Sequence, residues 1–329
     1  MAKIALTGIK PTGSPHIGNL LGAIKPALEL TKDYHALFFI ADYHALTTVK
    51  EKASLQKQIL EVAATWLAAG LDPEEVVFYR QSDIPEVFEL SWILSCFTPK
   101  GLLNRAHSYK AAVDENILKS HDPDNGINMG HYNYPILMAA DILMFNSNVV
   151  PVGHDQIQHL EMTRDIAHWF NTNYKNILVQ PEALIQQDVK TIPGIDGRKM
   201  SKSYNNVIPL YVPQKSLRKR IMQVVTDSKE VDEPKDPESC NLFAIYKLFA
   251  KEEDVKITHQ KYLEGGLGYG HLKQELFELI DAFVAEGREK YNYYMQNQKL
   301  MEDILSEGAV KARKIATPLL SKIRNTIGI

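Results

Sequence analysis

Short apolar runs alternate with longer segments of helical periodicity along the first two thirds of the chain. The runs predict strands at residues 4–6, 36–40, 76–80 and 149–152. Between them, apolar residues recur every three to four positions, which predicts helices at residues 55–69, 87–96 and 156–170. This alternation favours an α/β fold, a doubly wound parallel sheet with helices on both faces. In such a fold, ligands bind beyond the carboxyl ends of the strands.

The last third of the chain has a different pattern, because helical periodicity continues there with few strand signals. The helical pattern is interrupted at residues 233–237 and 265–268, where proline and glycine occur. We therefore expect an α/β domain at residues 1–205 and a smaller all-helical domain at residues 206–293. One irregularity is expected in the first domain: Pro26 lies inside a predicted helix, where it removes a backbone hydrogen bond and should kink the helix.

Composition narrows the class of protein. The 329 residues are 45% hydrophobic and 23% charged, as in a globular protein with a large core. The two cysteines, Cys96 and Cys240, are far apart and form no C-x-x-C pair, so we predict neither a zinc site nor a disulfide framework. No apolar stretch reaches membrane-spanning length and the chain opens directly on a strand, so we expect a cytoplasmic protein with no membrane partner.

The net charge of −3 gives no overall attraction to nucleic acid, but basic residues cluster locally. One cluster lies in a predicted helix, and the other lies in residues 308–329, which contain no acidic residue. The members are Lys215, Arg218, Lys219 and Arg220, and then Lys311, Arg313, Lys314, Lys322 and Arg324. They are either solvated helix faces or contacts for a phosphate backbone. Tyr291, Tyr293 and Tyr294 lie nearby and either stack on RNA bases or pack in the core.

Residues 199–203, Lys-Met-Ser-Lys-Ser, form the most chemically distinctive segment of the chain. Two ammonium groups on one short loop can each approach a phosphate oxygen, and the hydroxyls of Ser201 and Ser203 can donate to the same oxygens. Taken alone, such a loop is more often an ordinary solvated turn. A second segment changes this interpretation.

That second segment, residues 7–19, is a glycine-rich turn between a predicted strand and a predicted helix. Glycines 8, 13 and 18 let the backbone approach a ligand, and free N–H groups at a helix start favour an anion. The spacing is not the G-x-G-x-x-G of dinucleotide-binding proteins, so on its own it is equally a tight structural turn.

Together, residues 16–19 (His-Ile-Gly-Asn) and 199–203 resemble the two signatures of class I aminoacyl-tRNA synthetases, which activate amino acids as adenylates. At position 19 this chain has asparagine where the wider family has a second histidine, and the tryptophanyl branch shows the same difference. The resemblance implies a Rossmann-like catalytic domain, an anticodon-binding helical domain and a final helix, residues 294–329, that packs back on the catalytic domain.

The middle of the chain indicates which amino acid is activated. Residues 134–145 form an apolar helical stretch with a single carboxylate, Asp141, on the same face as Tyr134 and Met138. A buried carboxylate is costly unless it is paired. Asp141 either faces solvent or a helix end, or accepts a hydrogen bond from an indole N–H, which can only donate.

This stretch and residues 150–159 resemble bacterial members of the tryptophanyl branch, and the resemblance covers essentially the whole chain. It implies that the tryptophan site consists of Asp141, Tyr134, Met138, His44, Val150, Val152 and Gln156. It implies that the ATP site consists of Lys10, Pro11, Thr12, Gly18, Asn19, Gly153, His154, Asp155, Val189, Lys199, Met200, Ser201, Lys202 and Ser203. Lys10 and His154 replace a glutamine and an acidic residue common in the family, and we expect Lys10 to face phosphate or solvent.

The reaction expected from this resemblance joins L-tryptophan to ATP, with Mg²⁺, and then transfers it to tRNA(Trp). Lys199, Lys202 and Lys110 would stabilise the departing pyrophosphate, and no protein nucleophile is needed. The resemblance also implies a homodimer, to which residues 87–105 contribute. Three alternatives remain: a tyrosyl-tRNA synthetase, a nucleotidyltransferase making another adenylate, and a non-catalytic relative that binds RNA or a protein partner.

Overall fold

The computed structural model describes residues 2–153, 156–185 and 192–329, which contain one five-stranded parallel sheet. The strands are β1 (Ile4–Ile9), β2 (His35–Ile40), β3 (Val77–Arg80), β4 (Val149–Val152) and β5 (Glu182–Ile185). Their spatial order is β3-β2-β1-β4-β5, so the chain winds outward in both directions from β1. The doubly wound parallel sheet predicted from the sequence is thereby confirmed. The edge strand β5 was not predicted, because its four residues contain no run of β-branched or aromatic side chains.

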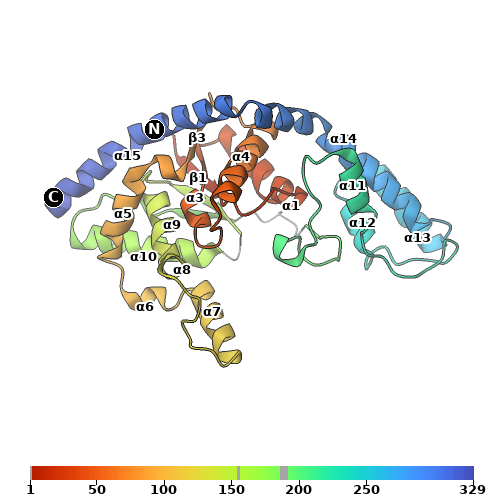
Figure 1. Ribbon diagram of the computed structural model, residues 1–329, viewed down its shortest axis with the longest axis horizontal. Helices are drawn as coiled ribbons and strands as arrows, with labels where there is room; N and C mark the ends of the chain where they lie inside the picture. The colour runs from red at the N-terminus through yellow and green to blue at the C-terminus, as the bar shows by residue number, and fades with distance from the viewer. Residues whose placement is uncertain (1, 154–155, 186–191) are drawn as a thin grey trace.

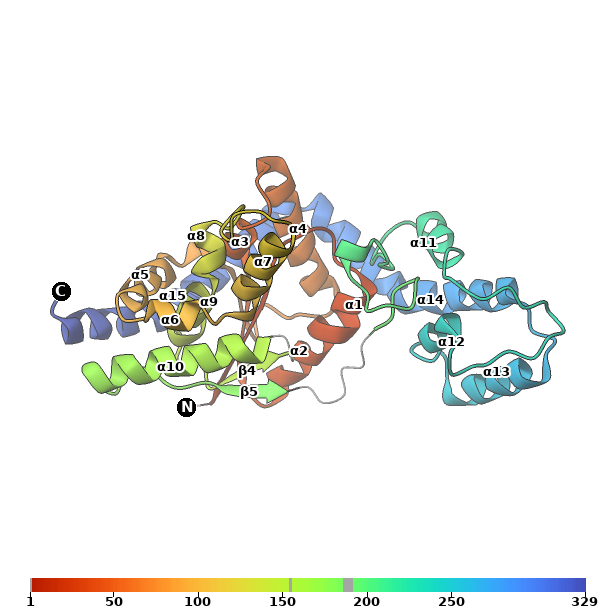
Figure 2. The ribbon, with the colours of Figure 1, turned by 90° about the horizontal axis from the view of Figure 1, so that it is seen from below.

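Helices cover both faces of the sheet (Figures 1 and 2). In the first half they are α1 (Ile17–Asn19), α2 (Lys25–Glu29), α3 (Asp42–Ala45), α4 (Lys52–Ala68), α5 (Pro85–Ser95), α6 (Lys100–Leu103), α7 (His107–Leu118), α8 (Met129–Tyr132), α9 (Tyr134–Leu143) and α10 (Ile157–Asn173). Short 3-10 turns lie at Leu30–Lys32, Gln81–Asp83 and Lys202–Tyr204. Among the described helices, none is long and apolar enough to cross a membrane.

Strand β2 shows why the sheet is buried on both sides. Leu37 and Phe39 belong to one core cluster, which includes side chains of α5, α9 and α10. Phe38 and Ile40 point the other way, into a second cluster that includes side chains of α4 and the carboxyl-terminal helices. Successive side chains of a strand point to opposite faces, so a run of apolar residues is what a strand covered on both faces requires.

The helix that follows β1 is distorted, as Pro26 predicts, and the distortion has a specific form. Between α1 and α2 lies a π-helical turn, Leu20–Ile24, in which the N–H of Lys25 donates to the carbonyl of Leu20. Pro26 itself is near the start of α2. Because proline has no N–H to continue the α-helical hydrogen bonds, the ladder widens in the turn just before it.

The last third of the chain is helical, as expected. Its helices are α11 (Gln214–Ile221), α12 (Asn241–Tyr246), α13 (Glu252–Glu264), α14 (Tyr269–Gln296) and α15 (Gln298–Ile327). Helices α11 to α13 gather around the far end of α14, and α15 runs back over β3 and α5 (Figure 1). The close approach of α15 needs Gly308, because a Cβ there would lie 1.7 Å from the carbonyl oxygen of Phe78 in β3.

Candidate active site

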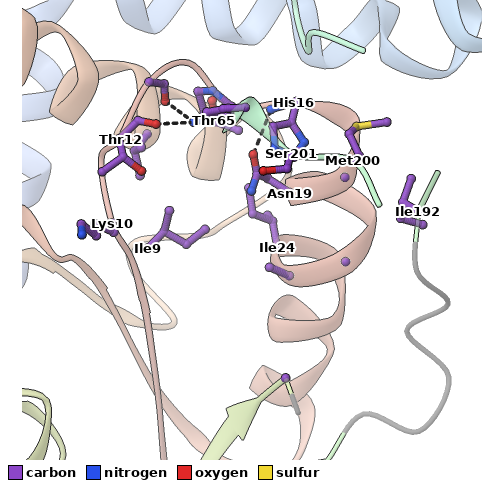
Figure 3. Close-up of a pocket in the computed structure, with 18 of the residues that line it drawn as sticks. Ile9, Lys10, Thr12, His16, Asn19, Ile24, Thr65, Ile192, Met200 and Ser201 are labelled. Atoms are coloured by element: carbon purple, nitrogen blue, oxygen red, sulfur yellow. Dashed lines mark hydrogen bonds between the residues drawn. The ribbon is translucent and has the colours of Figure 1, made fainter. Parts of the chain in front are cut away.

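A cavity of about 1030 Å³ lies beyond the carboxyl ends of β1 and β4, where the strand order reverses. The loop after β1, the irregular helix that follows it, the end of β4 and the lysine loop, residues 199–203, all line this cavity (Figure 3). This is the place where a doubly wound sheet binds its ligands. The two segments singled out in the sequence, 180 residues apart, therefore meet in one cavity.

Most residues predicted for the ATP site line this cavity. The described ones that do so are Lys10, Thr12, Gly18, Asn19, Gly153, Lys199, Met200, Ser201, Lys202 and Ser203. Pro11 is buried beside them and is not part of the lining. His154, Asp155 and Val189 lie outside the described residues. Lys110 is exposed on α7 and is not brought to the cavity.

The glycine-rich turn is held by α4, a contact that the sequence analysis did not predict. The N–H of Gly13 donates to Oε1 of Gln58 over 2.8 Å. The hydroxyl of Ser14 donates to Oε2 of Glu61 over 2.7 Å. Gly13 has a φ of +88°, a conformation that only glycine adopts readily. The turn is thus shaped by its own glycine and fixed by two polar side chains of the neighbouring helix.

Lys202 reaches across to the same turn. Its ammonium donates to the carbonyl oxygens of Thr12 and Gly13 over 2.9 and 2.5 Å. Partial loss of solvation lowers the pKa of Lys202 to about 8, and the nearby Glu61 carboxylate opposes that shift. In this structure the lysine loop and the glycine-rich turn are therefore directly joined.

His16 begins the first signature and is buried against Gly18. Burial, followed by the positive charge of Lys202, lowers the pKa of His16 to about 4, so the ring is neutral near pH 7. Its backbone N–H donates to Oδ1 of Asn19 over 3.1 Å, which ties the departing residue of the signature into the helix start. His16 lines the cavity although it was not among the predicted site residues.

A second polar cluster, formed by Asp141, His44 and Gln81, lies buried beside this cavity. Asp141 is only 2% exposed. Its Oδ2 is 2.8 Å from Nε2 of His44, and Nε2 of Gln81 donates to Oδ1 over 2.8 Å and to Oδ2 over 3.0 Å. Burial raises the pKa of Asp141, while the hydrogen bonds from His44 and Gln81 counter that rise. Asp141 does not face solvent, so the solvent-exposed alternative is wrong.

Of the other residues predicted for the tryptophan site, Tyr134 lies closest to this Asp141 cluster among the contacts that the structure gives. The ring of Tyr134 lies 4.4 Å from the ring of His44, and Met138 is half-buried on the same helix. Val150 and Val152 are buried in β4, and Val152 also lines the cavity. Gln156 precedes α10, with its Oε1 3.1 Å from Nδ1 of His159.

Lys10 connects the two regions. It lines the cavity, its ammonium donates to Oγ1 of Thr47 over 3.0 Å, and it lies 5.7 Å from the ring centre of Tyr134. Burial lowers the pKa of Lys10. Lys10 therefore faces the cavity while its ammonium is held near the Asp141 cluster.

Gln81 is the residue of the Asp141 cluster that the sequence analysis missed. It is completely buried and directly follows β3. Its Oε1 also accepts a hydrogen bond from the N–H of Tyr43. The rule that ligand-binding residues follow the carboxyl ends of parallel strands could have indicated Gln81, but no motif includes it.

Charge distinguishes the chemistry of the two regions. The described residues that line the cavity include Lys10, Lys199 and Lys202 but no carboxylate, which suits a polyphosphate. The Asp141 cluster instead offers carboxylate oxygens in a buried setting. The Nδ1 atom of His44 is also buried there with no hydrogen-bond partner among the described residues. A ligand that enters this region can satisfy such an atom.

Comparison with known proteins identifies the class first. Residues 2–285 match the family described as tRNA synthetases class I (W and Y), so the chain belongs to that family. It is 53% identical to the tryptophan–tRNA ligase of Pseudomonas aeruginosa over 98% of this chain and 73% of that one. It is 50% identical to the tryptophan–tRNA ligase of Neisseria meningitidis over 99% of this chain and 98% of that one.

A solved structure agrees with these relatives. The tryptophanyl-tRNA synthetase of Campylobacter jejuni, complexed with ADP and tryptophan, is 46% identical and superposes with a TM-score of 0.91, covering 99% of this chain and all of that one. The predicted membership of the tryptophanyl branch is confirmed. A tryptophan–tRNA ligase, rather than a tyrosyl enzyme or a non-catalytic relative, is the function these similarities support.

Proposed function

We propose that this chain activates L-tryptophan with ATP and transfers it to tRNA(Trp), releasing AMP and diphosphate. The observation that carries the proposal is a link between the Asp141 cluster and the cationic cavity that both class I signatures line. Lys10 lines this cavity and lies 5.7 Å from the ring centre of Tyr134, whose ring is 4.4 Å from that of His44. An aromatic amino acid and a polyphosphate can then lie next to each other. ATP is a substrate of the family, and a relative was crystallised with ADP and tryptophan.

In the first step, a carboxylate oxygen of tryptophan forms a bond to the α-phosphorus of ATP. The bond from that phosphorus to the bridging oxygen breaks, and pyrophosphate departs with the electron pair. The attacking carboxylate is already ionised at neutral pH, so positioning and charge stabilisation are the protein's main contributions. In the second step, a terminal ribose hydroxyl of the tRNA attacks the activated carbonyl carbon and loses its proton. The bond from that carbon to the phosphate oxygen breaks, and AMP leaves with the electron pair.

The residues that line the cavity bind ATP and stabilise the pyrophosphate that departs from it. Gly18, Asn19 and Gly153 hold the nucleotide close to the backbone, while Lys199 and Lys202 face the departing pyrophosphate. Lys110 completes the set of cations in this proposal and would have to approach from α7, because it does not line the cavity here. Mg²⁺ would arrive with ATP, bound by phosphate oxygens and water, since the described lining offers it no carboxylate.

The Asp141 cluster binds the indole ring of the tryptophan substrate. A carboxylate can accept about four hydrogen bonds, and those from Gln81 and His44 leave capacity on Oδ1 for the indole N–H. Met138, Val150 and Val152 would wall the ring. Tyr134 and Gln156 would hold the ammonium and carboxylate of the amino acid.

In this proposal, residues 206–293 bind the anticodon of the tRNA. The basic cluster of α11 is partly committed to the fold, because Arg220 donates to the carbonyls of Val207 and Asn205. In α15, Arg313 and Arg324 pair with Glu86 and Glu89. Arg218 is exposed but donates from Nε to Oε1 of Gln274 over 2.8 Å, so the exposed Lys215 and Lys219 are the better candidates for phosphate contacts. Such an enzyme would act in the cytoplasm, where tRNA is charged.

A homodimer is also part of this proposal. Trp92 of α5 is 73% exposed, and Phe88 on the same helix contacts Tyr43 with a ring separation of 4.0 Å. A second copy could cover this aromatic surface, which lies within the predicted interface, residues 87–105. Sedimentation of the Trp92→Glu variant tests the assignment: a monomer is expected, and an unchanged dimer would place the interface elsewhere.

ATP–pyrophosphate exchange with a panel of amino acids tests the proposed function. Exchange that depends on tryptophan alone is the expected result. Exchange with tyrosine would make the chain a tyrosyl enzyme, and exchange with no amino acid would revive a binding role. Aminoacylation of tRNA(Trp) with labelled tryptophan then tests the second step.

A further inference from the structure

Asn206 lies immediately behind the lysine loop and is 1% exposed. Its side-chain oxygen accepts the backbone N–H of Ser201 over 2.8 Å. Its amide nitrogen donates to the carbonyl of Lys199 over 3.1 Å and to Oδ1 of Asp196 over 2.7 Å. One side chain thus fixes the peptide groups on both sides of Met200.

The backbone around Asn206 forms a small hairpin. The N–H of Gly194 donates to the carbonyl of Arg198 over 2.7 Å, and the N–H of Met200 donates to the carbonyl of Ile192 over 2.9 Å. The backbone carbonyl of Asn206 accepts from Ile195 over 2.8 Å. The Asn206 side chain fits there because residue 194 is glycine: a Cβ at position 194 would lie 2.4 Å from that side chain.

We propose that Asn206 is a positioning residue for the lysine loop: it sets the spacing of Lys199 and Lys202 so that both meet the departing pyrophosphate. The inference rests on the proposed function, since it assumes that these lysines act on pyrophosphate. Asn206 is not itself a catalytic residue, because it is buried and does not line the cavity.

The chemistry of the site explains why this position holds an amide. A planar amide presents a donor and an acceptor at once, as the Lys199 carbonyl and the Ser201 N–H require. Aspartate has almost the same shape but only accepts, so it would set an oxygen against the carbonyl of Lys199 and the carboxylate of Asp196. The hydrogen bond from Asn206 is also the main influence that lowers the pKa of Asp196.

A fixed backbone matters because the Lys202 side chain has to change partners. Its ammonium is bound to the carbonyls of Thr12 and Gly13, and it would have to leave them to reach a phosphate. Holding the backbone through Asn206 lets the side chain move while its Cα stays in register with Lys199. Less conformational freedom is then lost when the pyrophosphate departs.

The test compares Asn206→Asp with Asn205→Asp in tryptophan-dependent ATP–pyrophosphate exchange. Asn205 is the matched control, because it is adjacent, exposed and has a φ of +49°, which aspartate tolerates. Both variants add the same charge near the lysines. We expect Asn206→Asp to lower kcat by about thirtyfold with the KM for tryptophan within about twofold, and Asn205→Asp to stay within about threefold of wild type.

A double-variant experiment separates positioning from general damage. Because Asn206 is proposed to keep Lys202 in register with Lys199, there is no register left to keep once Lys202 is removed. Adding Asn206→Asp to Lys202→Ala should therefore lower kcat by no more than about threefold further. An equal thirtyfold loss in both backgrounds would overturn the inference, as would equal activities of the Asn205 and Asn206 variants. Should Asn206→Asp fail to fold in thermal melts, Asn206→Ala, which introduces no repulsion, takes its place with an expected tenfold loss. If the wild-type protein itself shows no tryptophan-dependent exchange, the proposed function is wrong, rather than the role of Asn206.

Discussion

The cationic cavity and the Asp141 cluster lie at the same end of one sheet, yet they are built in opposite ways. In the Asp141 cluster, the charged group is buried and held by His44 and Gln81. In the cavity, lysines lie on loops, and the Lys202 ammonium donates to the backbone carbonyls of Thr12 and Gly13, contacts that it can exchange for phosphate. Fixed, buried groups suit recognition of one side chain, whereas exchangeable contacts suit a charge that departs during the reaction.

This contrast predicts a separation of kinetic effects. Changes in the cavity should act mainly on turnover, and changes in the Asp141 cluster should act mainly on the choice and binding of the amino acid. Lys10 lines the cavity and also lies near Tyr134, so a substitution there is expected to affect both.

Lys202→Ala should have the largest effect. Removal of the ammonium deprives the departing pyrophosphate of a cation, so kcat for exchange is expected to fall by about 10²- to 10³-fold. The KM for tryptophan should stay within about twofold of wild type. Steady-state exchange measures both, with Lys215→Ala on α11 as an exposed control. Small, equal changes in kcat and KM would show that Lys202 does not stabilise the departing pyrophosphate.

Asp141→Ala should have the second-largest effect, on the selectivity for tryptophan over other amino acids. Tryptophan loses the acceptor for its indole N–H, so its preference over phenylalanine in kcat/KM is expected to fall by about 10²-fold. Thermal unfolding should also show a loss of about 1–3 kcal/mol, because His44 and Gln81 lose their partner. Asp165→Ala, an exposed acid on α10, is the control. A variant that still prefers tryptophan as strongly would rule out the indole role.

A pair of glutamine variants compares the two regions directly. Gln81→Met keeps the volume but removes the donor to Asp141, so the KM for tryptophan should rise about tenfold with little change in kcat. Gln58→Met removes the acceptor for Gly13 and should lower kcat a few-fold while leaving that KM unchanged. Kinetics that do not separate in this way would mean the two regions act as one unit.

The smallest expected effect is a pH dependence. Raising the pH through about 8 removes the proton of Lys202 in the free enzyme, so its positive charge is lost on the alkaline side. At saturating tryptophan, kcat/KM for ATP should fall about eightfold between pH 7.5 and 9. Lys202→Arg, which stays charged, should flatten the profile. A variant with the wild-type slope would assign the titration to another group.

Parts of the fold and the site that depend on local patterns were predictable. Four strands follow from apolar runs, and the distortion near Pro26 follows from its missing N–H. The two signatures and Asp141 stand out because their residue types and spacing are unusual. Strand β5 was missed because four residues at a sheet edge carry too weak a pattern.

The sequence by itself thus determined the alternation of strands and helices, the family and the chemical groups available. Only the tertiary structure decided which groups meet: Lys202 with Thr12, Gln81 with Asp141 and Gln58 with Gly13. Lysine and glutamine occur throughout the chain, mostly at the surface, and nothing local separates the few that find a partner from the rest. Those contacts arise when parallel strands bring their carboxyl ends to one edge of the sheet, because packing, rather than neighbouring sequence, sets distances between remote residues.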